Sequence, residues 1–188
     1  MVSLTTPNIT FGIPAPDFDL PGVDGNRHTL ADVRGQSGLL VMFICNHCPY
    51  VKAIRERLVD ACREMEAFGI KSVAISSNDA SHYPEDDFEH MKAYAKAYRF
   101  SFPYLYDESQ DVARSYGAVC TPDFFGYNGD LQLQYRGRFD AAGRNPATAA
   151  MRRELVDAMK MIALTGKGPE EQTPSVGCSI KWRSEFSF

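Results

Sequence analysis

The most distinct pattern in the chain is an unbroken run of apolar side chains from Leu39 to Ile44. A run of this length without a polar position fits a strand buried on both faces, as central parallel strands are. After Tyr50 the period changes, and apolar residues recur every three or four positions between charged ones: Val51, Ile54, Leu58, Ala61, Met65 and Phe68. This pattern predicts an amphipathic helix, which Gly69 ends.

Similar patterns predict the remaining elements. Further strands are expected at 71–76 and 102–106, and further helices at 84–98, at 107–116 and from Asn145-Pro146 to Gly166. Two turn signals, Asp24-Gly25 and Asn128-Gly129, predict hairpins that join 17–20 to 26–30 and 124–127 to 131–136. Prolines indicate an irregular lead-in over residues 1–22 and a tail over 167–188. Because strands alternate with helices, we expect a single α/β domain over residues 1–188.

Composition and charge exclude several classes of partner. The 188 residues carry 20 Lys and Arg against 24 Asp and Glu, a net charge of −4. This mild acidity gives no reason to expect nucleic acid or an anionic membrane as a partner. The apolar run 39–45 is too short to cross a bilayer, and the first twenty residues hold no Lys, Arg or continuous apolar block. A secretory signal is therefore not expected, and the cytoplasm is the expected location.

The cysteines carry the most specific chemical signal. The chain has five of them, too few and too scattered for a disulfide scaffold: Cys45, Cys48, Cys62, Cys120 and Cys178. Cys45 and Cys48 flank the point where the apolar strand meets the next helix, and Pro49 suits the first helical position. Unpaired N–H groups at a helix N-terminus stabilise a thiolate, and His47 and Lys52 can add positive charge beside it. Cys48 is therefore the candidate nucleophile, with Cys45 as the second sulfur.

Two other interpretations of the cysteine pair stay open. A closed zinc site needs four ligands, and the chain has no second CxxC and no His-x-x-x-His. A mononuclear metal site would need Cys45, Cys48, His47 and the distant Cys178. The pair could also be two inert buried thiols, although α/β folds place sites at the carboxyl ends of strands. Redox chemistry without a metal or another cofactor is the favoured interpretation.

Three motifs together define a family resemblance: Ala15-Pro16-Asp17-Phe18-Asp19-Leu20 with Asp24-Gly25, the strand–cysteine–helix unit, and Thr121-Pro122. With these motifs, residues 10–165 resemble the thioredoxin superfamily, in particular its peroxiredoxin-like redoxins (the alkyl hydroperoxide reductase and thiol-specific antioxidant family). The resemblance implies a three-layer α/β/α sandwich with an N-terminal hairpin and a C-terminal tail extension. It also implies that Pro122 is a cis-proline facing the reactive cysteine, and that the backbone of Thr121 holds a bound disulfide or peptide.

The same resemblance assigns roles to the cysteines. The reactive cysteine of these families follows the last Phe of the strand by five positions, which leads from Phe43 to Cys48. Val51 occupies the position of the thioredoxin partner cysteine, and this chain instead carries Cys45 before the reactive one. Peroxiredoxins have a proline and a hydroxyl residue where this chain has Val41 and Cys45. The arginine with which peroxiredoxins polarise peroxide is replaced near Thr121 in this chain. The resemblance therefore implies thiol–disulfide exchange through Cys48 with Cys45 as partner, and only weak peroxide reduction.

The other cysteines and the acidic residues leave alternatives open. Cys120 could lie across the site from Cys48 or fill a small buried space. Cys178 could be a resolving thiol that the tail brings in, as in some peroxiredoxins, or have no role. Cys62 is expected in the core, and the run Glu85-Asp86-Asp87 on a solvated helix surface.

The expected substrate is a disulfide or an oxidant, and an external dithiol of the thioredoxin or glutathione type would restore the thiols. The alternatives are a copper- or zinc-binding module and a redox-inert interaction domain. In the latter, the tail aromatics Trp182, Phe186 and Phe188 would dock on a partner or on a second copy of the chain, which allows a homodimer.

Overall fold

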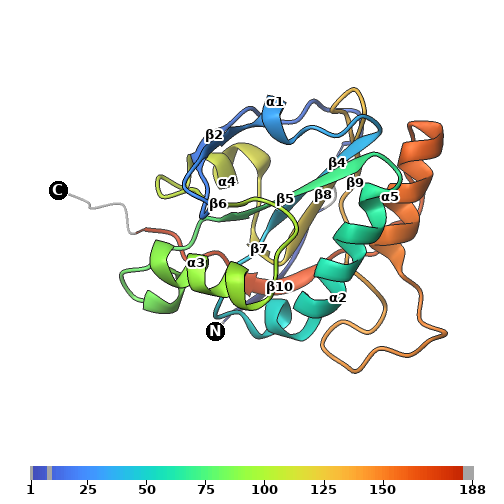
Figure 1. The fold of residues 1–188 in the computed structure, drawn as a ribbon. Helices are drawn as coiled ribbons and strands as arrows, with labels where there is room; N and C mark the ends of the chain where they lie inside the picture. The colour runs from blue at the N-terminus through green and yellow to red at the C-terminus, as the bar shows by residue number, and fades with distance from the viewer. Residues whose placement is uncertain (1, 8–9, 184–188) are drawn as a thin grey trace.

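A five-stranded sheet in the order β6-β5-β4-β8-β9 forms the centre of the computed structural model, which describes residues 2–7 and 10–183 (Figure 1). β4 (Gly38–Phe43), β5 (Ile70–Ser76) and β6 (Tyr104–Tyr106) are parallel. β8 (Asp123–Asn128) runs antiparallel to β4, and β9 (Leu133–Tyr135) runs antiparallel to β8. Every residue of β4 is buried, as the continuous apolar pattern predicts.

Helices cover both faces of this sheet. Leu40 and Met42 join the apolar side chains of α2 (Pro49–Glu66), α3 (Phe88–Ala97) and α5 (Glu154–Thr165) in one core cluster. Leu39, Val41 and Phe43 join a second cluster with α1 (Leu30–Val33), α4 (Asp111–Tyr116) and the hairpin of β2 (Asp19–Pro21) and β3 (Arg27–Thr29). Alternate side chains of β4 thus pack into two core clusters, because successive residues of a strand point to opposite faces. The result is the expected thioredoxin-like α/β/α sandwich.

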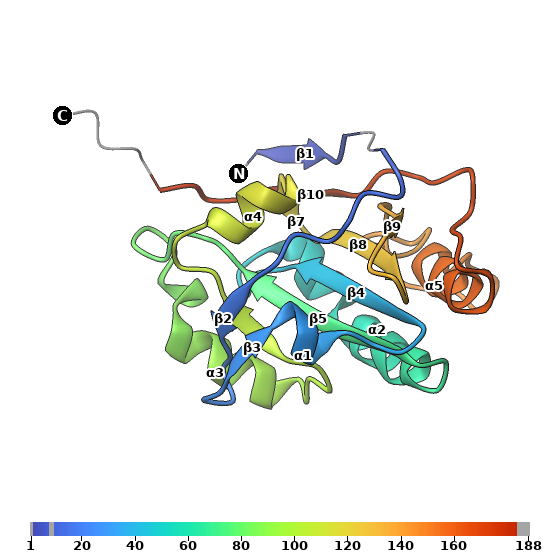
Figure 2. The same ribbon diagram turned by 90° about the horizontal axis from the view of Figure 1, so that it is seen from above.

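The sequence does not predict a second, three-stranded sheet. β1 (Ser3–Thr5) pairs with β10 (Val176–Ser179), and β10 pairs with β7 (Cys120–Thr121), all antiparallel. Figure 2 shows β1 and β10 running together along one side of the molecule. The expectation of an irregular lead-in is therefore wrong at β1, and the tail contains β10. Strands of two to four residues show no alternation, and their partners are distant in sequence, so that tertiary pairing alone creates them.

Three predicted helices differ in extent. The helix expected from Pro146 begins at Glu154, because residues 145–153 are mostly exposed and offer one large apolar side chain for packing. The segment 84–98 divides at Asp87 into the 3-10 turn η1 (Pro84–Asp86) and α3, which the Asp87 carboxylate caps. α4 starts four residues later than expected, at Asp111.

None of the helices in the part of the chain that the structure describes combines the length and the apolar character that a membrane span needs.

The tail aromatics lie partly within the described residues. Trp182 is 38% exposed, and the guanidinium carbon of Arg114 lies 4.7 Å from the centre of its ring. Phe186 and Phe188 lie outside the described residues. The docking role of the tail therefore stays a prediction.

Candidate active site

Cys45 and Cys48 lie in the turn that joins β4 to α2. Cys48 is the N-cap of α2, and Pro49 is its first helical residue. The fixed φ of proline suits this position, and its missing N–H is one that the helix would leave unpaired. Both cysteine side chains are fully buried. The turn thus holds two thiols beneath the surface at the carboxyl end of the central strand.

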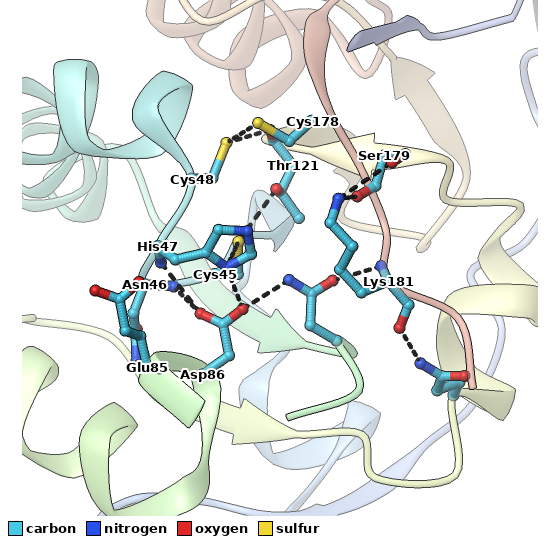
Figure 3. A network of polar contacts seen from close by, with 12 residues as sticks. Cys45, Asn46, His47, Cys48, Glu85, Asp86, Thr121, Cys178, Ser179 and Lys181 are labelled. Carbon is cyan, nitrogen blue, oxygen red and sulfur yellow. Dashed lines mark hydrogen bonds and ion pairs between the residues drawn. The ribbon is translucent and has the colours of Figure 1, made fainter. Parts of the chain in front are cut away.

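The Thr121–Pro122 step forms the opposite side of the site, and its peptide bond is cis, as expected. The Sγ of Cys48 lies 3.0 Å from the carbonyl oxygen of Thr121. The hydroxyl oxygen of Thr121 lies 3.3 Å from the Sγ of Cys45. One threonine therefore contacts both sulfur atoms of the CxxC pair (Figure 3).

Cys178 brings a third thiol to this group. Its strand, β10, pairs with β7 in a register that sets Cys178 opposite Thr121. The Sγ atoms of Cys48 and Cys178 lie 3.0 Å apart. This separation exceeds the roughly 2.05 Å of a disulfide bond, and all five cysteines are present as thiols. The tail therefore brings Cys178 to the cysteine turn, which a resolving role for this thiol requires.

His47 and Asp86 form a buried polar pair beside Cys45. Nδ1 of His47 lies 2.5 Å from Oδ2 of Asp86 and 3.7 Å from the Sγ of Cys45. Asp86 also accepts hydrogen bonds from the backbone N–H groups of Asn46 and His47 and from the side-chain amide of Asn78. One carboxylate thus fixes the conformation of the cysteine turn (Figure 3).

Asp86 is a residue of the site that the sequence does not indicate. The interpretation of Glu85-Asp86-Asp87 as a solvated run is wrong at this position, because Asp86 is fully buried. Nothing in the sequence separates it from its acidic neighbours, since only the turn η1 decides which of them points inward. Burial acts to raise the pKa of Asp86, but hydrogen bonds from His47 and Asn78 outweigh burial and hold it below its ordinary value. Asp86 is therefore a carboxylate at neutral pH.

The three thiols of the site differ in acidity. A hydrogen bond from the Cys45 thiol is the main cause that lowers the pKa of Cys48. Burial acts to raise this pKa, but further hydrogen bonds from the Cys178 thiol, the Thr121 hydroxyl and the Val51 N–H help to bring it to about 5. Burial, followed by the contact with Cys48, raises the pKa of Cys45 well above its ordinary value. The same two causes raise the pKa of Cys178 to about 12. At neutral pH one sulfur is ionised, and two protonated thiols can donate to it.

Three other candidates from the sequence have different surroundings. The Lys52 side chain is exposed, and its backbone N–H donates to the carbonyl oxygen of Cys48. Cys120 is buried beside Pro122, with its Sγ 3.6 Å from the Pro122 carbonyl oxygen. Cys62 lies in the core, and burial raises its pKa to about 12.

The Arg136 guanidinium is bound to partners outside the cysteine turn. Its guanidinium pairs with the buried Asp123 at 2.8 Å and donates to the carbonyl oxygen of Gly117. The guanidinium carbon also lies 4.5 Å from the ring centre of Phe125, which belongs to the core cluster on the sheet face away from Cys48. Asp123 and the Gly117 carbonyl oxygen therefore hold this guanidinium.

The cysteine turn and the cis-proline loop lie within a stretch that matches a known family. The model of the AhpC/TSA family matches residues 11–144. Chloroplastic peroxiredoxin Q of Gentiana triflora is 25% identical over 142 residues, which span 70% of this chain and 61% of that relative. An uncharacterized conserved protein from Geobacillus kaustophilus is 43% identical, and its crystal structure superposes with a TM-score of 0.91 over 98% of both chains.

A more distant structure shares the fold. Peroxidoxin BcpB from Mycobacterium tuberculosis is 16% identical, and it superposes with a TM-score of 0.61 over 85% of this chain and 98% of its own. The family match ends before β10, so that Cys178 lies outside it. Because the match includes the whole strand–cysteine–helix unit and the cis-proline loop, the chain belongs to the AhpC/TSA family.

Proposed function

We propose that the protein is a thiol-dependent oxidoreductase with antioxidant-type chemistry, which exchanges thiols and disulfides at Cys48. The observation that supports this function is the position of Cys48 at the N-terminus of α2, opposite cis-Pro122 and with a pKa of about 5. A thiolate, and not a thiol, is the nucleophile in such exchange. At pH 7 a thiol with this pKa is about 99% ionised.

The reaction begins with attack of the Cys48 thiolate on one sulfur of a disulfide, which forms a mixed disulfide and expels a thiolate. A second cysteine then attacks Cys48 and releases the rest of the substrate, so that an internal disulfide forms. Two thiols are in reach for this step: Cys45, the partner expected from the CxxC pair, and Cys178. An external dithiol of the thioredoxin or glutathione type then reduces the internal disulfide, which suits a reducing compartment such as the cytoplasm.

Disulfide exchange is favoured over peroxide reduction by the polar groups around Cys48. Peroxide cleavage needs donors aimed at the oxygen atoms where charge develops. Arg136 is bound to Asp123 on the other side of the sheet. Cys45 stands where peroxiredoxins have a hydroxyl residue, and the Thr121 hydroxyl contacts the Cys45 sulfur. Peroxide reduction is therefore expected to be weak.

The function is tested by following insulin-disulfide reduction and hydrogen peroxide consumption for the parent and for Cys48→Ser. The matched control is Cys62→Ser, which removes a buried thiol outside the site. We expect the control to keep the activity of the parent and Cys48→Ser to lose it. Equal rates for the parent and Cys48→Ser would exclude the proposal. A peroxide rate constant no higher than that of cysteine in solution would assign the activity to disulfide exchange alone.

Metal binding is the second candidate, because Cys45, His47 and Asp86 each offer a ligand atom within 4.8 Å of the others. Of the four ligands weighed from the sequence, Cys48 and Cys178 do not belong to this cluster. The Asp86 oxygen that faces His47 also accepts a hydrogen bond from Asn78, so a metal ion would have to replace the proton between His47 and Asp86. Elemental analysis of reduced protein decides: a stoichiometric metal that is lost in Cys45→Ala would favour this role.

A further inference from the structure

The chain itself fills the place where the cis-proline loop was expected to hold a substrate. The expected role of Thr121 was to pair its backbone with a bound disulfide or peptide. In the structure β10 pairs with that backbone, in a register that sets Cys178 opposite Thr121 and Ser179 opposite Cys120. The strand therefore presents a cysteine to Cys48 as a bound substrate strand would (Figure 3).

Several contacts hold β10 in this place. A Cβ atom at Gly177 would lie 2.3 Å from the carbonyl oxygen of Thr121, so the strand approaches the loop as closely as only glycine allows. The Ser175 hydroxyl donates to the carbonyl oxygen of Pro122 at 2.9 Å. On the other edge β1 pairs with β10, with Ser3 opposite Cys178. The position of Cys178 thus results from pairing on both sides of its strand.

We infer that β10 is an internal substrate strand and that Cys178, rather than Cys45, closes the disulfide with Cys48 during turnover. This inference rests on the proposed function and names its second sulfur. The Sγ of Cys178 lies 3.0 Å from that of Cys48. Cys178 belongs to β10, a strand at the surface in which Val176 is exposed. Cys45 instead lies at the end of the central strand, where Thr121 and His47 contact its sulfur.

The electron balance of this step is complete. The Cys48 thiolate attacks a disulfide RS–SR, forms Cys48–S–SR and expels RS⁻. Cys178 loses its proton, attacks the Sγ of Cys48 and expels the second RS⁻; one of the released thiolates takes up this proton. The two cysteine sulfurs are oxidised to a disulfide, and the two RS sulfurs are reduced.

The acidity of Cys178 fits this order of events. After burial, the contact with Cys48 is the next cause that keeps the pKa of Cys178 high. Once Cys48 is part of a mixed disulfide, it no longer carries the negative charge that opposes ionisation of Cys178. Cys178 therefore becomes a better nucleophile at the stage when it is needed. Cys45 then acts as a positioning residue, which donates to the Cys48 thiolate before the reaction.

The experiment oxidises the reduced protein with 2-hydroxyethyl disulfide, blocks remaining thiols with N-ethylmaleimide and maps the linked peptides by mass spectrometry. We expect a Cys48–Cys178 peptide in the parent, in Cys45→Ser and in the control Ser179→Ala, which changes the neighbouring residue of the same strand. In Cys178→Ser, Cys48 should keep one hydroxyethylthiol group. In Gly177→Ala, the added Cβ pushes β10 from Thr121 and should slow closure, since a misplacement of 1 Å can cost about a hundredfold in rate.

A Cys45–Cys48 peptide in the parent, with Cys178 alkylated, would overturn the inference and leave the proposed function intact. Cys48 that carries N-ethylmaleimide, and neither a disulfide nor a hydroxyethylthiol group, in both the parent and Cys178→Ser would overturn the inference together with the proposed function. The map thus distinguishes the two failures, because it reports separately whether Cys48 reacts and which sulfur it meets.

Discussion

Replacing Cys45 by alanine should make Cys48 a weaker acid. The Cys45 thiol is the main donor to the Cys48 thiolate, and alanine removes it. A hydrogen bond to a charged group contributes about 1.5–3 kcal/mol, which corresponds to roughly ten- to a hundredfold in an acid dissociation constant. From a pKa of about 5, the parent is about 90% thiolate at pH 6. In Cys45→Ala that fraction should fall to between about one half and about one tenth.

The assay is the rate of iodoacetamide alkylation of Cys48 from pH 4 to pH 9, measured by mass spectrometry of the Cys48 peptide. Dividing each rate by its plateau at high pH removes the effect of burial on access, so that the midpoint reports acidity alone. Cys45→Ser is the conservative variant, since its hydroxyl can still donate, and its midpoint should stay close to that of the parent. Cys62→Ala, which removes a buried thiol elsewhere on α2, should not move the midpoint.

A midpoint for Cys45→Ala equal to that of the parent would refute the reasoning. The acidity of Cys48 would then depend on the N-terminus of α2 and on Cys178. An equal rise of the midpoint in Cys45→Ala and Cys45→Ser would also contradict it, because the serine hydroxyl preserves the donor.

Three further outcomes follow from buried charges. Between pH 9 and pH 5 the unfolded Cys48 thiol holds a proton that the folded one has released, so falling pH should lower the urea midpoint of the reduced parent relative to Cys48→Ser. An unchanged difference between the two proteins over this range would show that the folded thiol ionises normally. Asp86→Ala leaves several buried donors, His47 among them, without their acceptor and should lower the free energy of unfolding by roughly 3 kcal/mol or more, and a loss below about 1 kcal/mol would contradict this. Arg136→Met leaves Asp123 buried without its partner and should cost roughly 3–5 kcal/mol in the same assay, with the pH midpoint of Cys48 alkylation unchanged.

The central sheet and the helix after it could be predicted because their signals are local. β4 is a continuous apolar run, and α2 has a clear apolar stripe, a proline at its start and a glycine beyond its end. Such patterns depend only on which residues are buried in each element. The start of α5 was predicted too early, because Asn145-Pro146 resembles a helix start although the residues after it have little to pack against the sheet.

The sequence by itself determined the cysteine turn: a strand, two cysteines and a helix, with a proline that fits the first helical position. The neighbours of Cys48 were decided by tertiary structure alone. Asp86 is buried while the adjacent acidic residues are not, and Cys178 meets Cys48 across 130 positions of the chain. The reason is physical: strand periodicity and helix caps depend on a few neighbouring residues, whereas the pairing of β10 with β7 joins distant segments through backbone hydrogen bonds. The residue type that this pairing requires, Gly177, does not indicate which segment lies opposite it.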